Sequence, residues 1–199
     1  MKEEKLPVPD THPATTIRSV NWSEDLALVR RLFQDYREWI NEHREIPPSG
    51  ETKLPVGMVQ LDRLISGLPG TYGPPRGEVL LAFDKDGLAA CGALREVAPN
   101  VGEIKRVYVR ADHRGPGFGH RFTSAMVSRA HDLGYERVRS YTLPSMYAAI
   151  QFYQDLGFRP IPAYWEHPVK GVLFFEYSFR ADPSDKRDAR VSKSKRSKK

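Results

Sequence analysis

Hydrophobic residues recur at helical spacing in one long segment near the N-terminus of the chain. In "EDLALVRRLFQDYREWINEHR" they are Leu26, Leu28, Val29, Leu32, Phe33, Tyr36, Trp39 and Ile40. This spacing predicts an amphipathic helix that begins at Asn21 or Ser23. Residues 14–21 alternate like a strand before it. Prolines and a glycine within 45–55 end the helix, and we interpret 56–70 as containing a short second helix.

Three strand-like runs follow in the middle of the chain, at residues 78–84, 88–97 and 101–109. The links between them, at 85–87 and 98–100, have the composition of tight turns. These runs therefore predict an antiparallel meander.

The C-terminal half alternates between helices and strands. A helix should follow the glycine-rich stretch at 114–121 and extend to about residue 133, with Gly134 as its C-cap. The later elements are a strand at 137–143, a helix at 145–156 ended by Gly157, and two strands within 158–165 and 172–179. This order predicts one α/β (α+β) domain over 14–180, with a mixed, mostly antiparallel twisted sheet flanked by helices.

The chain carries a net charge of +6, and +5 of it lies in residues 181–199. This basic tail has almost no apolar residues, so we expect it to be disordered and solvated. A nuclear-import or nucleic-acid-contacting segment is the alternative, which short basic runs match by chance. Because the rest of the chain is nearly neutral, we expect no nucleic-acid partner. Residues 1–13 are interpreted as an N-terminal extension.

Hydropathy and cysteine usage bear on the location of the protein. The sequence contains no apolar run near the ~20 residues of a membrane helix, and its N-terminus has no signal core. One cysteine, Cys91, excludes an internal disulfide and any multi-cysteine metal site. We therefore expect a cytoplasmic protein with no membrane partner. The spacing of the histidines predicts no metal.

The stretch "RGPGFGHR" places a glycine-rich turn between a strand and a helix. Free N–H groups at a helix N-terminus bind anions, and glycines let the backbone approach a phosphate closely. The turn therefore predicts a phosphate or pyrophosphate cradle, with a plain surface turn as the alternative. A P-loop would need Gly-Lys-Ser/Thr, and a dinucleotide fold would need a third glycine where His120 stands.

Three segments together resemble the GNAT superfamily of N-acetyltransferases: "EIKRVYV", "RGPGFG" and "AAIQFYQDLGF". The resemblance implies a GNAT-like fold and acetyl-coenzyme A as co-substrate. It implies that the turn holds the pyrophosphate through Arg114, Gly115, Pro116, Gly117, Phe118, Gly119 and His120. The strand residues Val107, Tyr108 and Val109 would meet the pantetheine arm, and the Val107 N–H would polarise the thioester carbonyl.

Acyl transfer to an amine needs a base for the ammonium and an acid for the leaving thiolate. The resemblance implies Glu103 as the base and Tyr153 as the acid. We expect burial to raise the pKa of Glu103 toward neutrality. The alternatives are a structural carboxylate paired with Lys105 or Arg106, and a core tyrosine. Relatives carry an asparagine that bonds the pantetheine arm, where this chain has Met146. Ser145 or a backbone group makes this bond here, or the bond is absent.

The remaining candidates concern the acceptor. Tyr36, Trp39, Trp165 and His167 either line the acceptor site or pack on the surface. Cys91, inside a predicted strand, is interpreted as a buried structural thiol. The function expected is acetyl transfer to a primary amine of a small molecule in a ternary complex. The alternatives are a lysine acetyltransferase guided by the basic tail and a non-catalytic acetyl-coenzyme A-binding module. By analogy, the last strands allow a homodimer.

Overall fold

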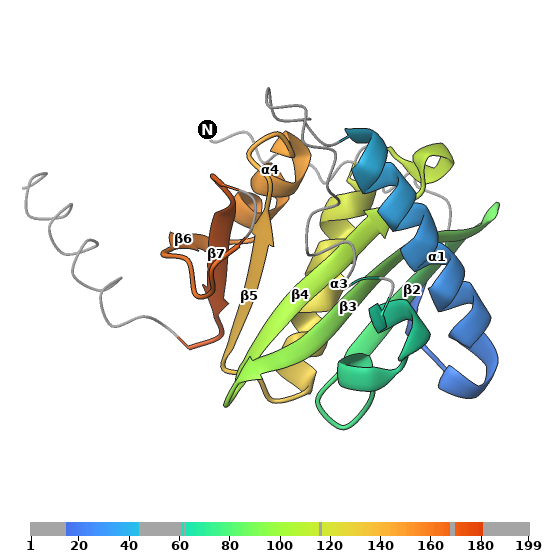
Figure 1. Cartoon of the computed structure of the whole chain (residues 1–199), viewed down its shortest axis with the longest axis horizontal. Coiled ribbons are helices and arrows are strands. Elements are labelled where there is room, and N and C mark those ends of the chain that lie inside the picture. Colours follow the sequence, from blue (N-terminus) through green and yellow to red (C-terminus); the bar gives the residue numbers. More distant parts are fainter. Residues whose placement is uncertain (1–14, 44–60, 62, 116, 168–169, 181–199) are drawn as a thin grey trace, which may run out of the picture.

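A mixed sheet of seven strands runs through the molecule in the order β1-β2-β3-β4-β5-β7-β6 (Figure 1). The computed structural model describes residues 15–43, 61, 63–115, 117–167 and 170–180. Its strands are β1 (Thr16–Ser19), β2 (Glu78–Asp84), β3 (Gly87–Ala98), β4 (Val101–Val109), β5 (Arg137–Thr142), β6 (Arg159–Ile161) and β7 (Leu173–Ser178). Its helices are α1 (Trp22–His43), α3 (Phe118–Asp132) and α4 (Tyr147–Asp155), with 3₁₀ turns η1 (Gly70–Tyr72) and η2 (Ala111–His113).

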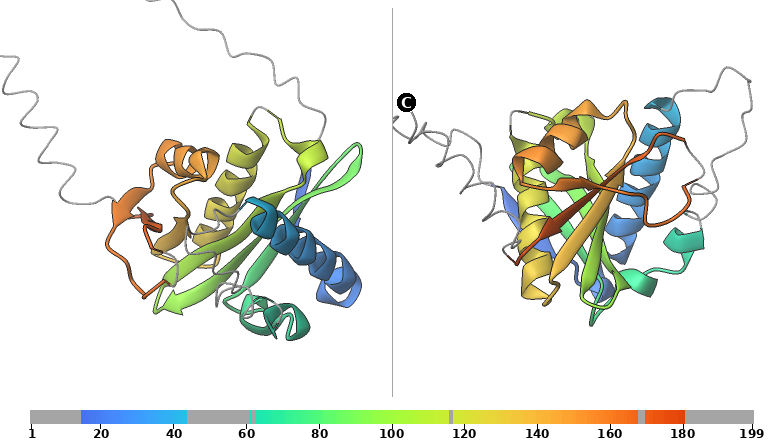
Figure 2. Two further views of the ribbon diagram at one scale, coloured as in Figure 1. Left: turned by 45° about the horizontal axis from the view of Figure 1, so that its top comes forward. Right: turned by 90° about the vertical axis from the view of Figure 1, so that its left-hand side faces the viewer.

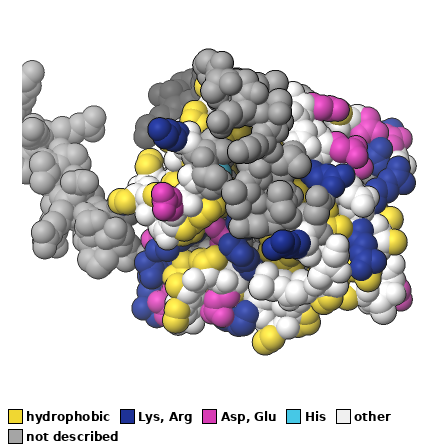
Figure 3. Space-filling view, in the orientation of Figure 1, with side chains coloured by type: hydrophobic (Ala, Val, Ile, Leu, Met, Phe, Trp, Pro, Cys, Tyr) yellow, Lys and Arg dark blue, Asp and Glu magenta, His cyan; other side chains and the backbone are white. Residues whose placement is uncertain are grey.

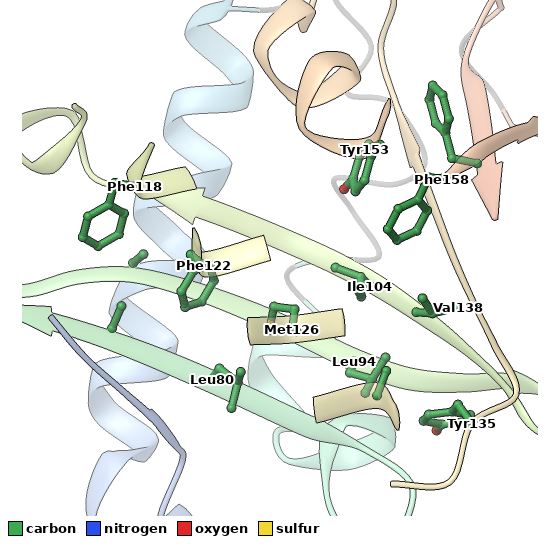
Figure 4. Close-up of a cluster of buried hydrophobic side chains, with 14 of the residues drawn as sticks. Leu80, Leu94, Ile104, Phe118, Phe122, Met126, Tyr135, Val138, Tyr153 and Phe158 are labelled. Carbon is green, nitrogen blue, oxygen red and sulfur yellow. The ribbon is translucent and has the colours of Figure 1, made fainter. Parts of the chain in front are cut away.

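Helices cover both faces of this sheet. Figure 2 shows α1 on one face and α3 with α4 on the other. Helix α1 buries Val29, Leu32 and Phe33 against the sheet, as its apolar spacing predicts. On the opposite face Phe122 and Met126 of α3 are fully buried in a core that also includes Tyr153 and Phe158 (Figure 4). The two faces therefore have separate apolar cores.

Strands β2 to β4 form the predicted antiparallel meander, β1 pairs with β2 antiparallel at its edge, and β5 then breaks the pattern. It pairs with β4 in parallel, through only three residue pairs that end at Glu103 and Arg139. Beyond that point the two strands diverge, which Figure 1 shows as a V that opens toward the C-terminal end of β4. The second half of β4 therefore has an edge that no described strand covers.

A bulge lies in β4 next to this opening. The register with β3 shifts between Cys91, opposite Tyr108, and Ala93, opposite Lys105. Arg106, inside the shift, has a φ of 56°, which is uncommon for a residue other than glycine. Backbone of this kind concentrates at functional sites, so the bulge directs attention to this part of β4.

The predicted elements agree with the observed ones within a few residues, and the predicted fold class is confirmed. The short helix expected within 56–70 is described only in part, with Leu61 and residues 63–66 helical. The predicted extension at 1–13, the basic tail at 181–199 and Pro116 lie outside the described residues. Within the described part of the chain, no helix has the length and apolarity required to cross a membrane.

Candidate active site

The glycine-rich turn lies at the N-terminus of α3, as the sequence predicts. The N-cap Gly117 has a φ of 82° and makes no side-chain cap. The Arg121 N–H bonds to the Gly117 carbonyl oxygen at 2.9 Å and the Phe118 N–H to that of Gly115 at 3.3 Å. The N–H groups of Gly119 and His120 have no acceptor within the helix, because they belong to its first turn. This end of α3 can therefore receive an anion.

Two glycines of the turn are required for different reasons. Gly117 needs its left-handed conformation, which other residues adopt only with strain. At Gly119 an added Cβ would lie 2.7 Å from Cε2 of Phe152, so that position is closed by the packing of α4. Gly115 is different, because an added Cβ there would meet nothing within 4 Å. A side chain at 115 would project into the space beside the turn.

Arg114, the cation predicted for the turn, folds back onto the end of β4. Its Nε donates to the Val109 carbonyl oxygen at 3.0 Å, and its guanidinium lies 5.1 Å from the centre of the Trp39 ring. His120 lies in the first turn of α3 and is half-buried. Both residues therefore lie at the anion-binding end of the helix.

The open edge of β4 presents the backbone of Val107 and Val109. The Arg110 N–H bonds to Ala89 on β3, so groups at alternate positions, 107 and 109, point to the opposite edge. The Val109 carbonyl already accepts from Arg114 on that side. Tyr108 differs, since it pairs with Cys91 and its ring lies against Tyr36 and Trp39. Two of the three predicted strand residues thus offer backbone groups to the V.

Tyr153 reaches the apex of the V from α4. Its hydroxyl lies 2.6 Å from Oγ of Ser140, and this serine donates to the Ile104 carbonyl oxygen at 3.0 Å. Ser140 and Ile104 directly follow the last paired residues of β5 and β4. Burial raises the pKa of Tyr153 to about 12, against the opposing effect of the Ser140 hydrogen bond. The hydroxyl therefore carries its proton at neutral pH, as an acid must.

Glu103 lies on the other side of the apex, and the expectation for its pKa is wrong. Its carboxylate is fully buried, and burial alone would raise the pKa. Lys105 at 3.2 Å and Arg95 at 2.8 Å pair with Oε2, and the Tyr164 hydroxyl donates to Oε1 at 2.6 Å. These contacts outweigh burial, so the pKa of Glu103 is lowered and the group is a weak base.

Lys105 has the opposite character in the same cluster. Burial lowers its pKa to about 8, Glu103 opposes that change, and the charges of Arg95 and Arg106 add to it. Its Nζ lies 4.7 Å from the Tyr141 ring centre and 5.8 Å from that of Trp165. A substantial fraction of this amine is neutral slightly above neutral pH, so it too can accept a proton.

The four predicted acceptor residues form two aromatic groups, one on each side of the cationic part of β4. Tyr36 and Trp39 of α1 contact Tyr108, with ring centres 6.1 and 6.3 Å apart. Trp165 and His167 contact Tyr141, at 5.6 and 5.1 Å. The structure thus brings each pair to the face of β4 and β5 that carries Lys105.

Several residues of the site were not predicted from the sequence. They are Arg95, Ser140, Tyr141 and Tyr164, which lie on three segments far apart along the chain. Arg95 faces Glu103 across the β3–β4 register, so correct pairing of the two predicted strands would have found it. No local pattern marks the other three.

Cys91 fits the role expected from the sequence. Cys91 is fully buried, and burial raises the pKa of its thiol, which confirms a structural thiol rather than a nucleophile. The described residues contain no group of three or more histidine, cysteine or acidic side chains able to hold a metal. On the face shown in Figure 3, cationic and anionic side chains are interspersed.

Comparison with known proteins places this geometry in a family. The sequence profile of the acetyltransferase (GNAT) family matches residues 33–158. An uncharacterized N-acetyltransferase of Schizosaccharomyces pombe is 27% identical over 161 residues, which are 80% of this chain and 91% of that protein. The uncharacterized N-acetyltransferase YsnE of Bacillus subtilis is 34% identical over 92 residues, 44% of this chain and 61% of YsnE.

Solved structures share the fold. The acetyltransferase yncA of Salmonella typhimurium, described with its cofactor acetyl-CoA, has a TM-score of 0.59 at 17% identity and covers 85% of this chain and 96% of its own. The paia N-acetyltransferase of Thermoplasma acidophilum, in complex with coenzyme A, has a TM-score of 0.61 at 15% identity. The match covers 83% of this chain and 99% of the paia chain. The family match and the related N-acetyltransferases define the class of protein as an acyltransferase. The chain belongs to the acetyltransferase (GNAT) family, which confirms the resemblance found in its sequence.

Proposed function

We propose that this protein transfers an acetyl group from acetyl-coenzyme A to the primary amine of a small molecule, by direct attack in a ternary complex. The observation that carries the proposal is the uncovered edge of β4, which leads from the apex of the V to the N-terminus of α3. The related folds of yncA and paia, whose structures are described with acetyl-CoA and coenzyme A, support the choice of co-substrate.

The coenzyme would lie along that edge. Its pyrophosphate would accept hydrogen bonds from the free N–H groups of Gly119 and His120 in the turn, with the charge of Arg114 nearby. Its pantetheine arm would pair with the backbone of Val107 and Val109, in the way a further strand would. A thioester carbonyl there would receive the Val107 N–H, which stabilises the oxyanion as the amine attacks.

Tyr153 would donate the proton that the leaving thiolate needs. Its hydroxyl is protonated at neutral pH and lies at the apex, where the backbone edge of β4 begins. The thiolate would leave as the carbon–sulfur bond breaks, and the proton would pass from the tyrosine oxygen to sulfur. Bulk solvent would then restore the tyrosine proton.

Removal of the ammonium proton falls to the Glu103–Lys105 pair. We retain Glu103 as the predicted acceptor of this proton, directly or through a water. Its ion pairs weaken it as a base, and Lys105, with a pKa lowered to about 8, is the second candidate in the same cluster. The two candidates predict different pH–rate profiles.

The test combines coenzyme binding with a panel of acceptors. We expect acetyl-coenzyme A and coenzyme A, but not NAD, to raise the melting temperature. We expect thiol release from acetyl-coenzyme A with at least one small primary amine. Coenzyme binding without turnover on any amine or peptide would indicate the non-catalytic module, and turnover on lysine peptides alone would indicate the protein acetyltransferase. Either result would overturn the proposal.

A further inference from the structure

A cluster of half-buried cations lies on the α1 face of β4, beside the proposed acceptor site. Arg95, Lys105 and Arg106 act on one another or on shared neighbours strongly enough to shift their pKa values. Among the described residues, the carboxylate at the centre of the cluster is Glu103, which is already shared by Arg95, Lys105 and the Tyr164 hydroxyl. Three cations therefore share one anion.

Arg106 is the cation left over. Within the described part of the chain it forms no ion pair, and its buried Nε has no hydrogen-bond partner. Its guanidinium lies 5.7 Å from the ring centre of Tyr36. Burial acts to lower its pKa, and Tyr36, Tyr72 and Tyr141 together outweigh burial, Tyr36 partly through a hydrogen bond. A guanidinium with a buried Nε and no counter-ion among the described residues is costly, because it loses part of its hydration and gains no opposing charge from them.

The Tyr72 hydroxyl, near Arg106, is a second buried polar group without a hydrogen-bond partner among the described residues. The side chain of Tyr72 is 1% exposed, packed edge-on against Phe33 of α1 with ring centres 6.1 Å apart. Its hydroxyl has no hydrogen-bond partner among the described residues, and Arg106 is the nearby charge that most strongly opposes the effect of burial on its pKa. Such orphaned donors are rare in native structures and call for an explanation.

We propose that Arg106 and Tyr72 bind the carboxylate of the acceptor, so that the substrate is a small molecule with both a primary amine and a carboxylate. A carboxylate accepts the charge-assisted hydrogen bonds that the guanidinium offers and can accept a further one from the tyrosine hydroxyl. The inference rests on the proposed acetyl transfer to a small amine, and names its substrate class.

The position of Arg106 in the chain fits this role. It directly precedes Val107, whose N–H is proposed to meet the thioester carbonyl, and it lies within the bulge of β4. The bulge sends the arginine side chain to the α1 face while the following backbone faces the V. An anion at Arg106 and an amine at the thioester would then be a few bonds apart, as in an amino acid.

The experiment compares matched acceptors in three forms: a free amino acid, its carboxamide and the amine that lacks the carboxyl carbon. Initial rates are measured at saturating acetyl-coenzyme A. We expect at least one acid to exceed its amide and its amine by tenfold or more in kcat/KM. Amides or simple amines that are turned over as well as the acids would overturn the inference and leave the proposed function intact.

Two substitutions test whether Tyr72 and Arg106 cause the preference for the acid over its amide. Tyr72→Phe removes only the hydroxyl, and should raise KM for the acid several-fold while KM for the amide stays unchanged. Arg106→Gln should remove the preference for the acid altogether. Tyr147→Phe, whose side chain is 79% exposed, is the matched control and should behave as the wild type. A preference that survives both substitutions would overturn the assignment.

Stability separates this role from a structural one. If Arg106 only supported the fold, Arg106→Gln would lower the melting temperature. Because no described residue forms an ion pair with it, we expect that temperature to be unchanged or higher. If no amine is turned over, the proposed acetyl transfer to a small amine fails. The inference about the carboxylate is then tested separately, by measuring how amino acids and their amides stabilise the protein. Amino acids must then stabilise the coenzyme A-saturated wild type more than their amides do, and Tyr72→Phe must reduce that difference; equal stabilisation overturns the inference.

Discussion

The hydroxyl of Tyr153 and Oγ of Ser140 lie 2.6 Å apart at the point where β4 and β5 separate. Ser140 also holds the Ile104 carbonyl, so one serine connects the proposed acid on α4 to both strands of the V. The position of the tyrosine hydroxyl is therefore fixed by the sheet rather than by the helix alone.

Removal of the Tyr153 hydroxyl should affect chemistry far more than binding. We expect Tyr153→Phe to lower kcat by ~10²–10⁴, the usual contribution of a positioned acid, while the dissociation constant of coenzyme A changes little. Ser140→Ala should cause a smaller loss, because the Ser140 hydrogen bond lowers the pKa of Tyr153 and its absence makes the tyrosine a weaker acid. Steady-state rates and calorimetric titration of coenzyme A measure both effects. Wild-type turnover in Tyr153→Phe would remove the tyrosine from the mechanism.

The two candidate bases predict different responses to pH. A base must be unprotonated, so if Lys105 accepts the proton the rate rises through its pKa of about 8, and Lys105→Met abolishes that rise. Glu103→Gln should then shift the midpoint to lower pH, since Glu103 raises the pKa of Lys105. If Glu103 is the base, Glu103→Gln abolishes turnover and Lys105→Met does not. The pH–rate profiles of the three proteins, with one acceptor, distinguish these outcomes.

The glycine turn offers a test that leaves the fold intact. Gly115→Glu adds a carboxylate where a Cβ meets nothing within 4 Å, so the melting temperature of the free protein should be unchanged. Coenzyme A should no longer stabilise it, whereas it should add ~2.7 kcal/mol to the wild type at a hundred times its dissociation constant. Thermal-shift titration measures the difference, and a stabilisation equal to that of the wild type would argue for a plain surface turn.

Gly119→Ala is the matched structural variant in the same turn. Its Cβ would lie 2.7 Å from the Phe152 ring, so we expect a loss of about 1–3 kcal/mol from overpacking. Replacement of Phe152 by leucine in the same protein should recover part of that loss. Denaturant unfolding of the single and double variants measures it, and additive losses would show that the two side chains do not meet.

The Arg18–Asp25 pair predicts a pH-dependent part of the stability. The hydrogen bond from Arg18 is the largest cause of the lowered pKa of Asp25, whose Oδ2 lies 2.6 Å from the guanidinium. The pair stabilises the folded state fully at pH values above the unfolded Asp25 pKa of 3.8. This stabilisation is lost as the pH falls through the lower pKa of Asp25 in the folded state. Since Arg18 is partly exposed, we expect Asp25→Asn to cost about 1 kcal/mol at pH 7. Urea unfolding at pH 7 and pH 3, with the exposed Asp86→Asn as control, should show a cost that shrinks with acidity.

The sequence by itself determined the elements and the coenzyme end of the site. Apolar periodicity predicts α1, and alternation with turn residues predicts β2, β3 and β4, because these patterns depend on neighbours along the chain. The turn that begins α3 was also predicted from local features, since a glycine N-cap and free N–H groups need no distant partner.

Tertiary structure alone decided the character of the acidic and basic groups. From the sequence, Glu103 was expected to have a pKa raised by burial, with a carboxylate paired with Lys105 or Arg106 as the alternative. Burial does act in that direction, but Lys105, two residues along the same strand, has the largest opposing effect, and Arg95 on β3 and the Tyr164 hydroxyl add to it. No local pattern brings Arg95 or Tyr164 to Glu103. The Arg106 Nε and the Tyr72 hydroxyl, which lack hydrogen-bond partners among the described residues, arise in the same way, because charge balance depends on which segments meet across the sheet.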